Sequence, residues 1–581
     1  MTGPGPTDGP EDALTLRVLG ALHREDVLGL RSAGTLTHRA DGPWLAGPRC
    51  ALPVAEDGFQ SRWTARRPLL EVDGRAVTGL DGILAAVAGL ADPRDRAGHA
   101  AFAEECRRAL AADRLLTAHR PEVLDRLTAR LGPDPADWTG HRGTLGLDTL
   151  AAHLEHPVHP AGRGRAGLDD AQLLAHAPEF HPRFELRWLV LPPGAPLERG
   201  PGPLPDRWPS PADLGLPGPG TALPLHPLTD PRPLLAAVPG ARLAEHPYLA
   251  VRPTLSMRTV AVADDPALHL KLPLATSTLG LRNRRTVKPG TLADGAAGER
   301  LLAAVVAREP RFAGRILHAG EQTWLHSGHE LLAVLVRRQP AGLDGAVTTP
   351  LAALTARAPG GRTVLEHLAD RFHDGDVPAL YDDLLRLLLD WHTTLFRYGI
   401  ALESHQQNTS LVLDRPDGRT RLRLLFKDED GPRINTDRIG ELAPYAVAFD
   451  DPRIRCRGDR ALTDLFATIT GHLCTGSLAF ALARDGHAPL PHALGLLRHR
   501  LTEALDRAGA AAGPLRAALL GADRLPVKAM VTAGTLLDKA RSGAADINKH
   551  YTTGPNYLRS APAGPPGRPP RTAHTPAGAP V

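Results

Sequence analysis

Apolar residues at positions 381–398 recur every three or four residues, which is the spacing of one helix face. Gly399 ends this predicted helix, and the polar stretch ESHQQN follows at 403–408. Two short apolar runs, 410–413 and 422–426, then flank Pro416-Asp417-Gly418, which predicts a β-hairpin. The second run leads into the acidic sequence KDED at 427–430. We take this helix, loop and hairpin as the unit around which the chain is organised.

The same patterns predict the rest of an α+β fold. Residues 12–150 are expected to be mostly helical, with helices at 83–92, 97–119, 121–132 and 143–155. The middle of the chain predicts a mixed antiparallel sheet, with strands at 184–191, 268–272 and 329–338. Helices are expected again at 299–308, 364–373, 460–484 and 491–508. Proline- and glycine-rich stretches at 1–11 and 560–581 predict a mobile N-terminal tail and a disordered C-terminal tail, and 192–233 predicts a surface loop or boundary.

Length, charge and cysteines exclude several classes of protein. A chain of 581 residues is too long for one core, so we expect domains at 12–150, 151–350 and 351–559. The net charge of +4 gives no indication of nucleic-acid binding. The four cysteines form no C-x-x-C pair, which excludes a zinc ribbon. We find no signal peptide and no apolar run long enough to cross a membrane, so we expect a cytoplasmic protein.

The hairpin carries groups suited to a metal–nucleotide complex. Asn408 precedes its first strand and Asp428 follows its second, so an amide oxygen and a carboxylate can converge on one cation. Mg²⁺ takes oxygen ligands and usually only one or two from the protein, and protein kinases hold their metal ions with a comparable Asn and Asp. An isolated loop of this kind would usually be only a polar turn, so the interpretation depends on the neighbouring signals.

A second informative window, 247–290, alternates short strands with hydroxyl- and arginine-bearing turns. Lys271 is flanked by two leucines and should point to one face of a sheet. Ser256, Arg258 and Thr259 lie in a turn before it, and hydroxyl groups and arginines follow at 276–285. A lysine beside arginines and hydroxyls suits a phosphate. The alternative is an exposed basic hairpin.

A third window combines His-Pro dipeptides with arginines. The sequence HPVHPAGRGR at 156–165 presents His156, His159, Arg163 and Arg165. Imidazoles beside guanidinium groups would suit a polycarboxylate or a phosphate, which Arg binds bidentately. Arg337 or Arg338, at the end of the predicted strand 329–338, could supply a further clamp. The alternative is a proline-rich connector with solvated arginines.

Five motifs in this order resemble the NRPS-independent siderophore synthetases of the IucA/IucC (aerobactin synthetase-like) family. They are HPVHP at 156–160, LPLHP at 223–227, PTLSMRTV at 253–260, KLPL with TSTLGLR at 271–282, and ESHQQN with KD at 403–428. The resemblance implies a cupped hand, with a thumb at 12–150, fingers at 151–350 and a kinase-like palm at 351–559. It also implies ATP and Mg²⁺ between fingers and palm, and a homodimer would be compatible with it.

The resemblance further implies an ATP-dependent ligase that forms AMP and pyrophosphate. A citrate-like acid or dicarboxylate half-amide would become an acyl-adenylate, and an amine or hydroxylamine would then displace AMP. The catalytic residues implied are His405, Lys271 and Arg282. The ATP-binding residues implied are Ser256, Arg258, Thr259, Lys271, Thr278, Arg282, His405 and Asp428, with Ser277 or Arg285 as alternatives in the 276–285 segment. The residues implied for the substrate carboxylates are His156, His159, Arg163, Arg165 and Arg338, and those for the metal are Glu403, Asn408 and Asp428.

Other functions compete with this one. A kinase-like phosphotransferase could use the same hairpin, although no G-x-G-x-x-G loop precedes a strand lysine. A related amide-forming ligase of another small-molecule pathway, or a binding protein that has lost turnover, would keep the same residues. A nucleic-acid binder is disfavoured because the basic segment 282–288 lacks interleaved aromatic residues for base stacking. The sequence does not determine the acid or the amine.

Overall fold

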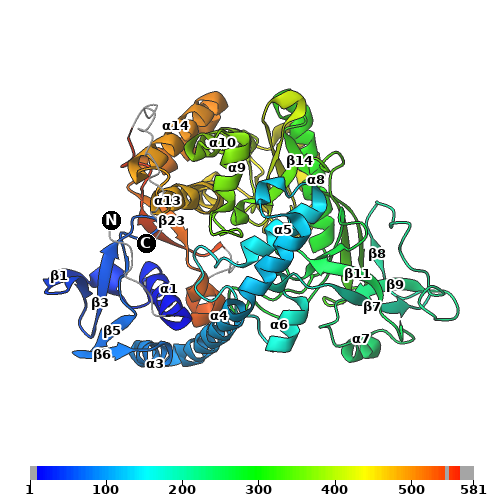
Figure 1. The fold of residues 1–581 in the computed structure, drawn as a ribbon, viewed down its shortest axis with the longest axis horizontal. Coiled ribbons are helices and arrows are strands. Elements are labelled where there is room, and N and C mark those ends of the chain that lie inside the picture. Colours follow the sequence, from blue (N-terminus) through cyan, green and yellow to red (C-terminus); the bar gives the residue numbers. More distant parts are fainter. Residues whose placement is uncertain (1–8, 544–548, 563–581) are drawn as a thin grey trace, which may run out of the picture.

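The computed structural model describes residues 9–543 and 549–562. Its first helix, α1 (Pro10–Arg24), buries Leu14, Val18 and Leu22, which lie four residues apart and therefore on one face. This face packs on the N-terminal sheet and on α4 (Arg96–Leu131) (Figure 1).

A six-stranded antiparallel sheet follows α1, so the prediction of a mostly helical segment is wrong for residues 35–78. The strands are β1 (Thr35–Arg39), β2 (Gly42–Ala46), β3 (Cys50–Glu56), β4 (Trp63–Ala65), β5 (Leu69–Val72) and β6 (Arg75–Thr78). They are too short to show a clear period. The informative signal is the turn between β5 and β6, where Asp73 and Gly74 both have positive φ, as a two-residue hairpin turn requires.

Helices α3 (Leu80–Leu90), α4 and α5 (Gly140–Ala152) complete the N-terminal part. The two helices predicted on either side of Pro121 are one helix, because Pro121 lies inside α4. Proline removes one backbone donor from a helix. Contacts with α1, α3 and α5 along α4 hold the helix together across this position.

The central sheet has nine strands, and all of its paired strands are antiparallel. Its order is β10-β7-β11-β12-β13-β16-β15-β8, with β9 paired to β7. The bounds are β7 (Phe184–Leu191), β8 (Glu198–Arg199), β9 (Thr221–Leu225), β10 (Arg242–Leu243), β11 (Tyr248–Pro253), β12 (Thr259–Val262), β13 (Leu268–Lys271), β15 (Gly320–His326) and β16 (Ala333–Arg338). The prediction of β7 is confirmed, whereas the strand expected from residue 329 begins only at Ala333.

A four-stranded sheet carries the predicted hairpin. Its order is β14-β20-β19-β17, from β14 (Ile316–His318), β20 (Arg421–Phe426), β19 (Thr409–Asp414) and β17 (Val347–Pro350). The pairing of β19 with β20 confirms the hairpin. Helix α8 (Thr291–Arg308) contacts β15 of the central sheet and β14 of this one, so it joins the two sheets. Helix α10 (Val377–Arg397) packs on β20 of the small sheet, and α9 (Val364–Phe372) packs on α10.

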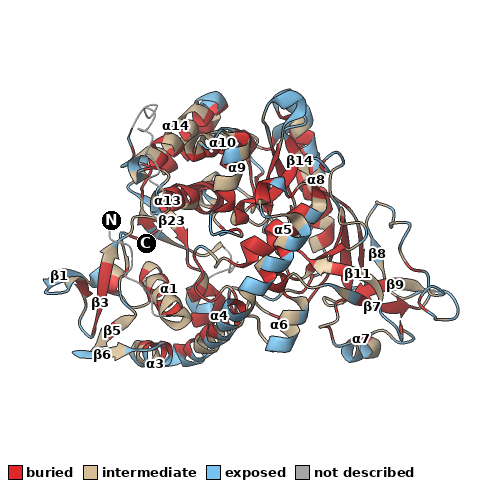
Figure 2. Ribbon diagram, in the orientation of Figure 1, coloured by how far each residue is buried: buried red, intermediate tan, exposed pale blue. Residues whose placement is uncertain are grey.

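The largest hydrophobic core forms between α10 and the C-terminal helices. Helices α12 (Arg460–Leu465) and α13 (Ser477–Arg484) are joined by the π-helical segment Phe466–Gly476, and α14 (Leu490–Ala508) packs on α10. Within the described residues, the helix Arg460–Arg484 is long and apolar enough to cross a membrane by length and composition, but 83% of its most apolar window is buried inside the protein. This helix is therefore part of the hydrophobic core. Figure 2 shows the same distribution, with buried residues where the helices and sheets pack on one another and exposed residues on the outer side of α3.

The C-terminal segments 524–543 and 549–555 pack against the N-terminal part of the chain. Strands β23 (Arg524–Lys528) and β24 (Tyr551–Pro555) form a hairpin, and the π-helical turn Thr532–Leu536 packs on α4. The Glu25 carboxylate accepts the backbone N–H groups of Val531 and Thr532 at 3.1 and 2.8 Å. These contacts hold the segment 531–532 against the end of α1. The parts of the predicted tails at 1–8 and 563–581 lie outside the described residues.

Several short elements connect these parts. They are α2 (Leu30–Ala33), α6 (Asp170–His176), α7 (Arg232–Ala237), α11 (Ala443–Val447), α15 (Gly513–Arg516), α16 (Lys539–Ser542) and the three-stranded sheet of β18 (Ile400–Ala401), β21 (Arg433–Asn435) and β22 (Arg455–Cys456).

Candidate active site

The β19–β20 hairpin brings Asn408 and Asp428 to one end of the small sheet. Thr409 pairs with Phe426, and the Lys427 N–H then donates to the Asn408 carbonyl at 3.1 Å. Asp428 has φ +59°, a left-handed conformation that is uncommon for a residue other than glycine. The chain turns out of the strand at this residue. Local pairing alone therefore brings these two residues to the same end of the hairpin.

Two cations from the central sheet meet Asp428 across the gap between the sheets. Lys271, at the end of β13, places Nζ 2.7 Å from Asp428 Oδ1 and 3.3 Å from Asp430 Oδ2. Arg337 on β16 also contacts Asp428, and its Nε lies 2.6 Å from Glu321 Oε1. The same Glu321 oxygen accepts the Asp428 N–H at 2.9 Å. Asp428 is therefore held by both of its sheet partners and by its own backbone.

These ion pairs keep the cluster charged near neutral pH. Burial alone would raise the pKa of Asp428, but Arg337 and Lys271 hold that pKa well below its usual range. Burial also disfavours the charged form of Lys271, but the carboxylates of Asp428 and Asp430 outweigh this effect of burial and raise the pKa of Lys271. Breaking such a buried pair leaves an uncompensated charge, which is strongly destabilising.

Arginines and hydroxyl groups form a second layer beside this cluster. The turn at 256–259 closes with a 2.7 Å hydrogen bond from the Thr259 N–H to the Ser256 carbonyl. Arg258 reaches out of this turn and donates to the carbonyl oxygens of Arg285 and Thr286 at 3.0 and 3.1 Å. The turn and the 276–286 segment are therefore held together through one guanidinium.

Arg282 and Arg285, the two arginines considered as nucleotide contacts in the 276–285 segment, lie in different places. Arg285 Nε donates to Thr278 Oγ1 at 2.6 Å. Burial, together with the nearby Arg258 and Arg165, lowers the pKa of Arg285 to about 9. Arg282 instead donates to the Ala533 carbonyl at 3.3 Å. Arg285 thus lies next to the cluster, and Arg282 faces the C-terminal segment.

Two lysines that the sequence analysis did not identify lie beside Glu403 and His405. Lys549 and Lys528 lie 3.4 and 3.5 Å from Glu403 Oε1. Although burial would raise the pKa of Glu403, these lysines and His405 lower it to about 2. The scarcity of lysine could have indicated them, because four of the six lysines lie in this region. The six are Lys271, Lys288, Lys427, Lys528, Lys539 and Lys549, among 68 basic residues.

The predicted histidines His156, His159 and His405 are neutral. Nδ1 of His156 accepts the His159 N–H at 3.0 Å, and Nδ1 of His405 accepts the Gln407 N–H at 3.3 Å. A backbone donor at Nδ1 places the proton on Nε2. Burial lowers the pKa of His405 to about 4 and that of His159 to about 3, and lowers the pKa of His156 well below its usual value.

The three arginines predicted for substrate carboxylates have carboxylate partners within the protein. Arg163 is buried and its Nε lies 2.6 and 2.7 Å from Asp113 and Glu155. Arg165 pairs with Glu179 at 2.6 Å. Arg338 is 56% exposed and pairs with Asp265 at 3.3 Å, on the opposite side of β16 from Arg337. The structure brings Arg337, and not these three, to Asp428.

A metal ion at the hairpin would be bound by one carboxylate and one amide oxygen of the protein. Among residues 9–543 and 549–562, no three His, Cys, Asp or Glu side chains gather as metal ligands. The oxygen donors at the end of the hairpin are Asp428 and Asn408, and Asn408 is buried. One carboxylate and one amide oxygen fit Mg²⁺, which fills the remaining positions with phosphate oxygens and water.

Comparisons with known proteins match both halves of this site. A model of the IucA/IucC family matches residues 147–195 and 242–356, which include Lys271 and Arg337. Over these residues the chain is similar to this family. A model described as ferric iron reductase FhuF-like transporter matches residues 382–542, which include Asn408 and Asp428. Because Lys271 and Asp428 form one ion pair, the two matched segments of the chain build one site.

The proteins to which this chain is similar include named synthetases. Staphyloferrin B synthase of Staphylococcus aureus is 26% identical over 215 residues, which cover 34% of this chain and 36% of that protein. The aligned region therefore spans about a third of the length of that relative. Petrobactin biosynthesis protein AsbB from Bacillus anthracis shares the fold, with a TM-score of 0.71, 15% identity and coverage of 94% of this chain and 95% of that chain. ATP-bound aerobactin synthetase IucA from Klebsiella pneumoniae has a TM-score of 0.69, 17% identity and coverage of 94% and 99%. The names of these relatives support an enzyme.

Proposed function

We propose that this protein is an ATP-dependent carboxylate–amine ligase of siderophore biosynthesis. It activates a citrate-like acid or a dicarboxylate half-amide as an acyl-adenylate and condenses it with an amine or hydroxylamine. The observation that carries the proposal is the Lys271–Asp428–Arg337 cluster, which joins the two segments matched by family models. The ATP named with the aerobactin synthetase of the same fold supports the nucleotide.

The proposed reaction has two steps. A carboxylate oxygen of the acid attacks the α-phosphorus of ATP, the bond from that phosphorus to the bridging oxygen breaks, and pyrophosphate leaves. A neutral nitrogen then attacks the acyl carbon, the carbon–oxygen bond to AMP breaks, and the nitrogen loses one proton. Both steps develop negative charge on phosphate oxygens, which preorganised cations stabilise.

The residues of the chain have separate roles in this proposal. Lys271 and Arg258 face the phosphates, and His405 donates its Nε2–H to an oxygen that gains charge, since its low pKa makes it a poor base. The predicted nucleotide contacts remain Ser256, Thr259, Thr278 and Arg282. We add Arg285, because it donates a hydrogen bond to Thr278. Asp428 and Asn408, with Glu403 as a predicted further ligand, would hold Mg²⁺. When bound, that ion would neutralise phosphate charge.

The substrate acid is proposed to lie beside His156 and His405. Lys528 and Lys549 add positive charge there, because both sit at Glu403. His159, Arg163, Arg165 and Arg338 remain predictions for the acid. Arg163 and Arg165 would first have to leave their present carboxylate partners. The cupped-hand division at residues 150 and 350, the homodimer and the cytoplasmic location also remain predictions.

The test is pyrophosphate release with ATP and Mg²⁺ across a panel of polycarboxylic acids, each with and without hydroxylamine. We expect acid-dependent pyrophosphate and AMP, with a hydroxamate formed on trapping. ADP in place of AMP would instead establish a kinase-like phosphotransferase. No nucleotide cleavage with any acid would contradict the ligase assignment.

A further inference from the structure

Four arginines lie around the turn that precedes β7, and none of them belongs to the candidate active site. Two are near the C-terminal end of α4, one follows the turn and one is on β11. They are Arg126, Arg130, Arg183 and Arg252. Helix α4 packs on the 3₁₀-helical start of the turn, Pro178–Phe180, and β11 pairs with β7. The fold therefore brings three separate segments together here.

Hydrogen bonds to backbone carbonyls fix two of the guanidinium groups at the turn. Arg126 Nη2 donates to the Phe180 carbonyl at 3.0 Å. Arg252 Nη1 donates to the carbonyls of His181 and Pro182 at 2.9 and 3.3 Å. Three consecutive carbonyls thus hold guanidinium groups from two different elements. Because carbonyls carry no net charge, these bonds position the two cations without neutralising them.

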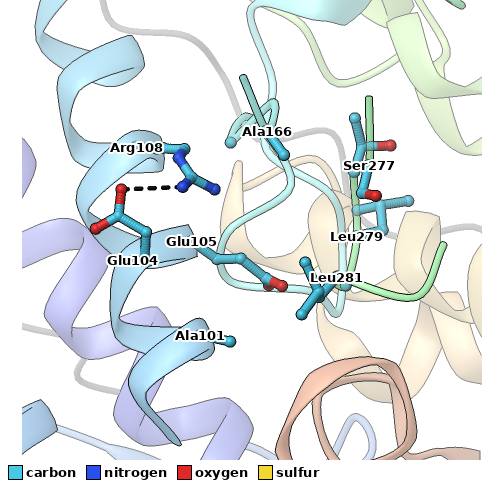
Figure 3. A pocket seen from close by; sticks show the side chains of 11 residues that line it. Ala101, Glu104, Glu105, Arg108, Ala166, Ser277, Leu279 and Leu281 are labelled. Atoms are coloured by element: carbon cyan, nitrogen blue, oxygen red, sulfur yellow. Dashed lines mark ion pairs between the residues drawn. The ribbon is translucent and has the colours of Figure 1, made fainter. Parts of the chain in front are cut away.

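Little of the charge of this cluster is neutralised by the protein. Among the described residues, Arg126 is the only one of the four with a carboxylate partner, which is Glu122 at 2.7 Å. The other three form no ion pair within residues 9–543 and 549–562. In contrast, Arg108, nearer the start of the same helix, lies 3.0 Å from Glu104, a pair drawn as the dashed line in Figure 3. The cluster is therefore a local excess of positive charge and not a general property of α4.

The arginines of the cluster repel one another. Burial, together with Arg130, Arg183 and Arg126, lowers the pKa of Arg252 to about 10. Burial, with Arg252, Arg130 and Arg126, also lowers the pKa of His181 to about 3. Like charges held this close destabilise a folded protein, and an anion bound between them would remove the repulsion.

The turn between these arginines is strained. His181 has φ +49° and ψ +46°, a left-handed conformation that is uncommon for a residue other than glycine. Its Nδ1 lies 2.9 Å from Thr149 Oγ1, which holds the ring in place. Strained backbone positions of this kind are frequent at ligand-binding sites. His181 is also the middle one of the three residues whose carbonyls accept hydrogen bonds from Arg126 and Arg252.

We propose that this arginine cluster binds a small multivalent oxyanion, such as a diphosphate or a tricarboxylate. Guanidinium groups bind phosphate and carboxylate oxygens through paired N–H donors. Arg126 and Arg130 are four residues apart on α4, so about 5–6 Å separates their Cβ atoms, and a ligand with two or three anionic groups matches this spacing. Arg126, Arg130 and Arg183 are exposed, so the ligand reaches them from solvent. The proposal is independent of the proposed function, because none of the four arginines has a role in it.

Calorimetric titration without Mg²⁺ tests this binding without turnover. Pyrophosphate, citrate and inorganic phosphate are each titrated at low ionic strength into three proteins. Arg130→Gln/Arg183→Gln removes two exposed charges of the cluster, and the control Arg107→Gln/Arg108→Gln removes two charges on α4 that already have carboxylate partners. We expect the unmodified protein to bind pyrophosphate or citrate at one site that the first variant weakens at least about tenfold and the control does not. Inorganic phosphate should bind at that site more weakly than either.

Three results of this titration would overturn the proposal. They are equal affinities in all three proteins, an equal loss in both variants, and tighter binding of a single-stranded oligonucleotide than of both multivalent anions. ATP–pyrophosphate exchange in the presence of the acid substrate separates this site from the candidate active site. The first variant should keep at least about half of the exchange rate, and an equal fall in exchange and binding would place the arginines in the active site instead. If no protein shows exchange, the ligase assignment fails and the titration still decides this proposal.

Thermal unfolding gives a second test of the cluster. Without the anion, Arg130→Gln/Arg183→Gln should raise Tm by about 1–3 °C at low ionic strength, because it removes like charges that repel one another. Pyrophosphate should raise the Tm of the unmodified protein more than that of this variant, because it binds the folded cluster. A lower Tm of the variant without the anion, or an equal rise in both proteins with it, would contradict the proposal.

Discussion

Acidification should unfold this protein through its buried histidines. Burial lowers the pKa of nine described histidines to between about 3 and 4. They are His23, His153, His159, His181, His226, His318, His392, His405 and His472. An unfolded histidine has a pKa of about 6.5. Since the folded pKa is the lower one, the stability from each neutral histidine is fully present above pH 6.5 and is lost as pH falls toward 4.

The magnitude follows from these values. At pH 5.5 an unfolded histidine is about nine-tenths protonated and a folded one only a few per cent, so the nine should take up about eight protons on unfolding. Asp57 and Glu105, whose pKa values burial raises to about 6, would release about 0.7 protons each. Each histidine costs about 1.2 kcal/mol of stability between pH 7 and pH 5.5, so the nine together cost about 11 kcal/mol. That is comparable to the whole stability of about 5–15 kcal/mol of a folded domain, so little stability should remain at pH 5.5 and acid unfolding should follow below it.

A pH-stat measures the uptake directly. Guanidinium unfolding at pH 5.5 in unbuffered solution should consume about six to nine protons per chain. His392→Leu should reduce the uptake by about one proton, because His392 is buried and its Nε2 has no hydrogen-bond partner among the described residues. His246→Leu, at an exposed position, is the control and should change nothing. A total uptake below about three protons would refute the reasoning.

Three further predictions concern the candidate site. Lys271→Met should slow pyrophosphate release at least about 100-fold, because it removes a buried cation. The control Lys288→Met, at an exposed lysine, should not slow it. Equal activity of the two variants would contradict the role of Lys271. The rate of pyrophosphate release should show no inflection near pH 6.5, because His405 is neutral well below that pH; an inflection there that is lost in His405→Asn would count against a neutral donor. Gly298→Ala should destabilise by about 1–3 kcal/mol in thermal unfolding, since its Cβ would lie 2.2 Å from a backbone oxygen beside the cluster. Gly89→Ala, with nothing within 4 Å, should be neutral or slightly stabilising, and an equal loss in both would contradict the steric reason.

Local patterns were sufficient where neighbours in sequence make the structure. The amphipathic face of α10, strand β7 and the β19–β20 hairpin depend on residues within about twenty positions of one another, and all three are confirmed. The sheet β1–β6 was missed because its strands of three to seven residues carry too few positions to show a period. The helix break expected at Pro121 was wrong because contacts with other helices decide whether a proline is tolerated.

The sequence by itself determined the resemblance to the IucA/IucC family, the order of the motifs that carry it and the side chains available for chemistry, because these properties belong to residue types and short spacings. Only the tertiary structure decided which of those side chains meet. Arg337 and Arg338 are adjacent in sequence, yet they point to opposite faces of β16, and only the packing of the two sheets selects Arg337 as the partner of Asp428. Likewise, Lys528 and Lys549 come more than a hundred residues after Glu403, and the return of the chain brings them to it. Contacts across such distances depend on the burial and packing of the whole molecule, which no local pattern contains.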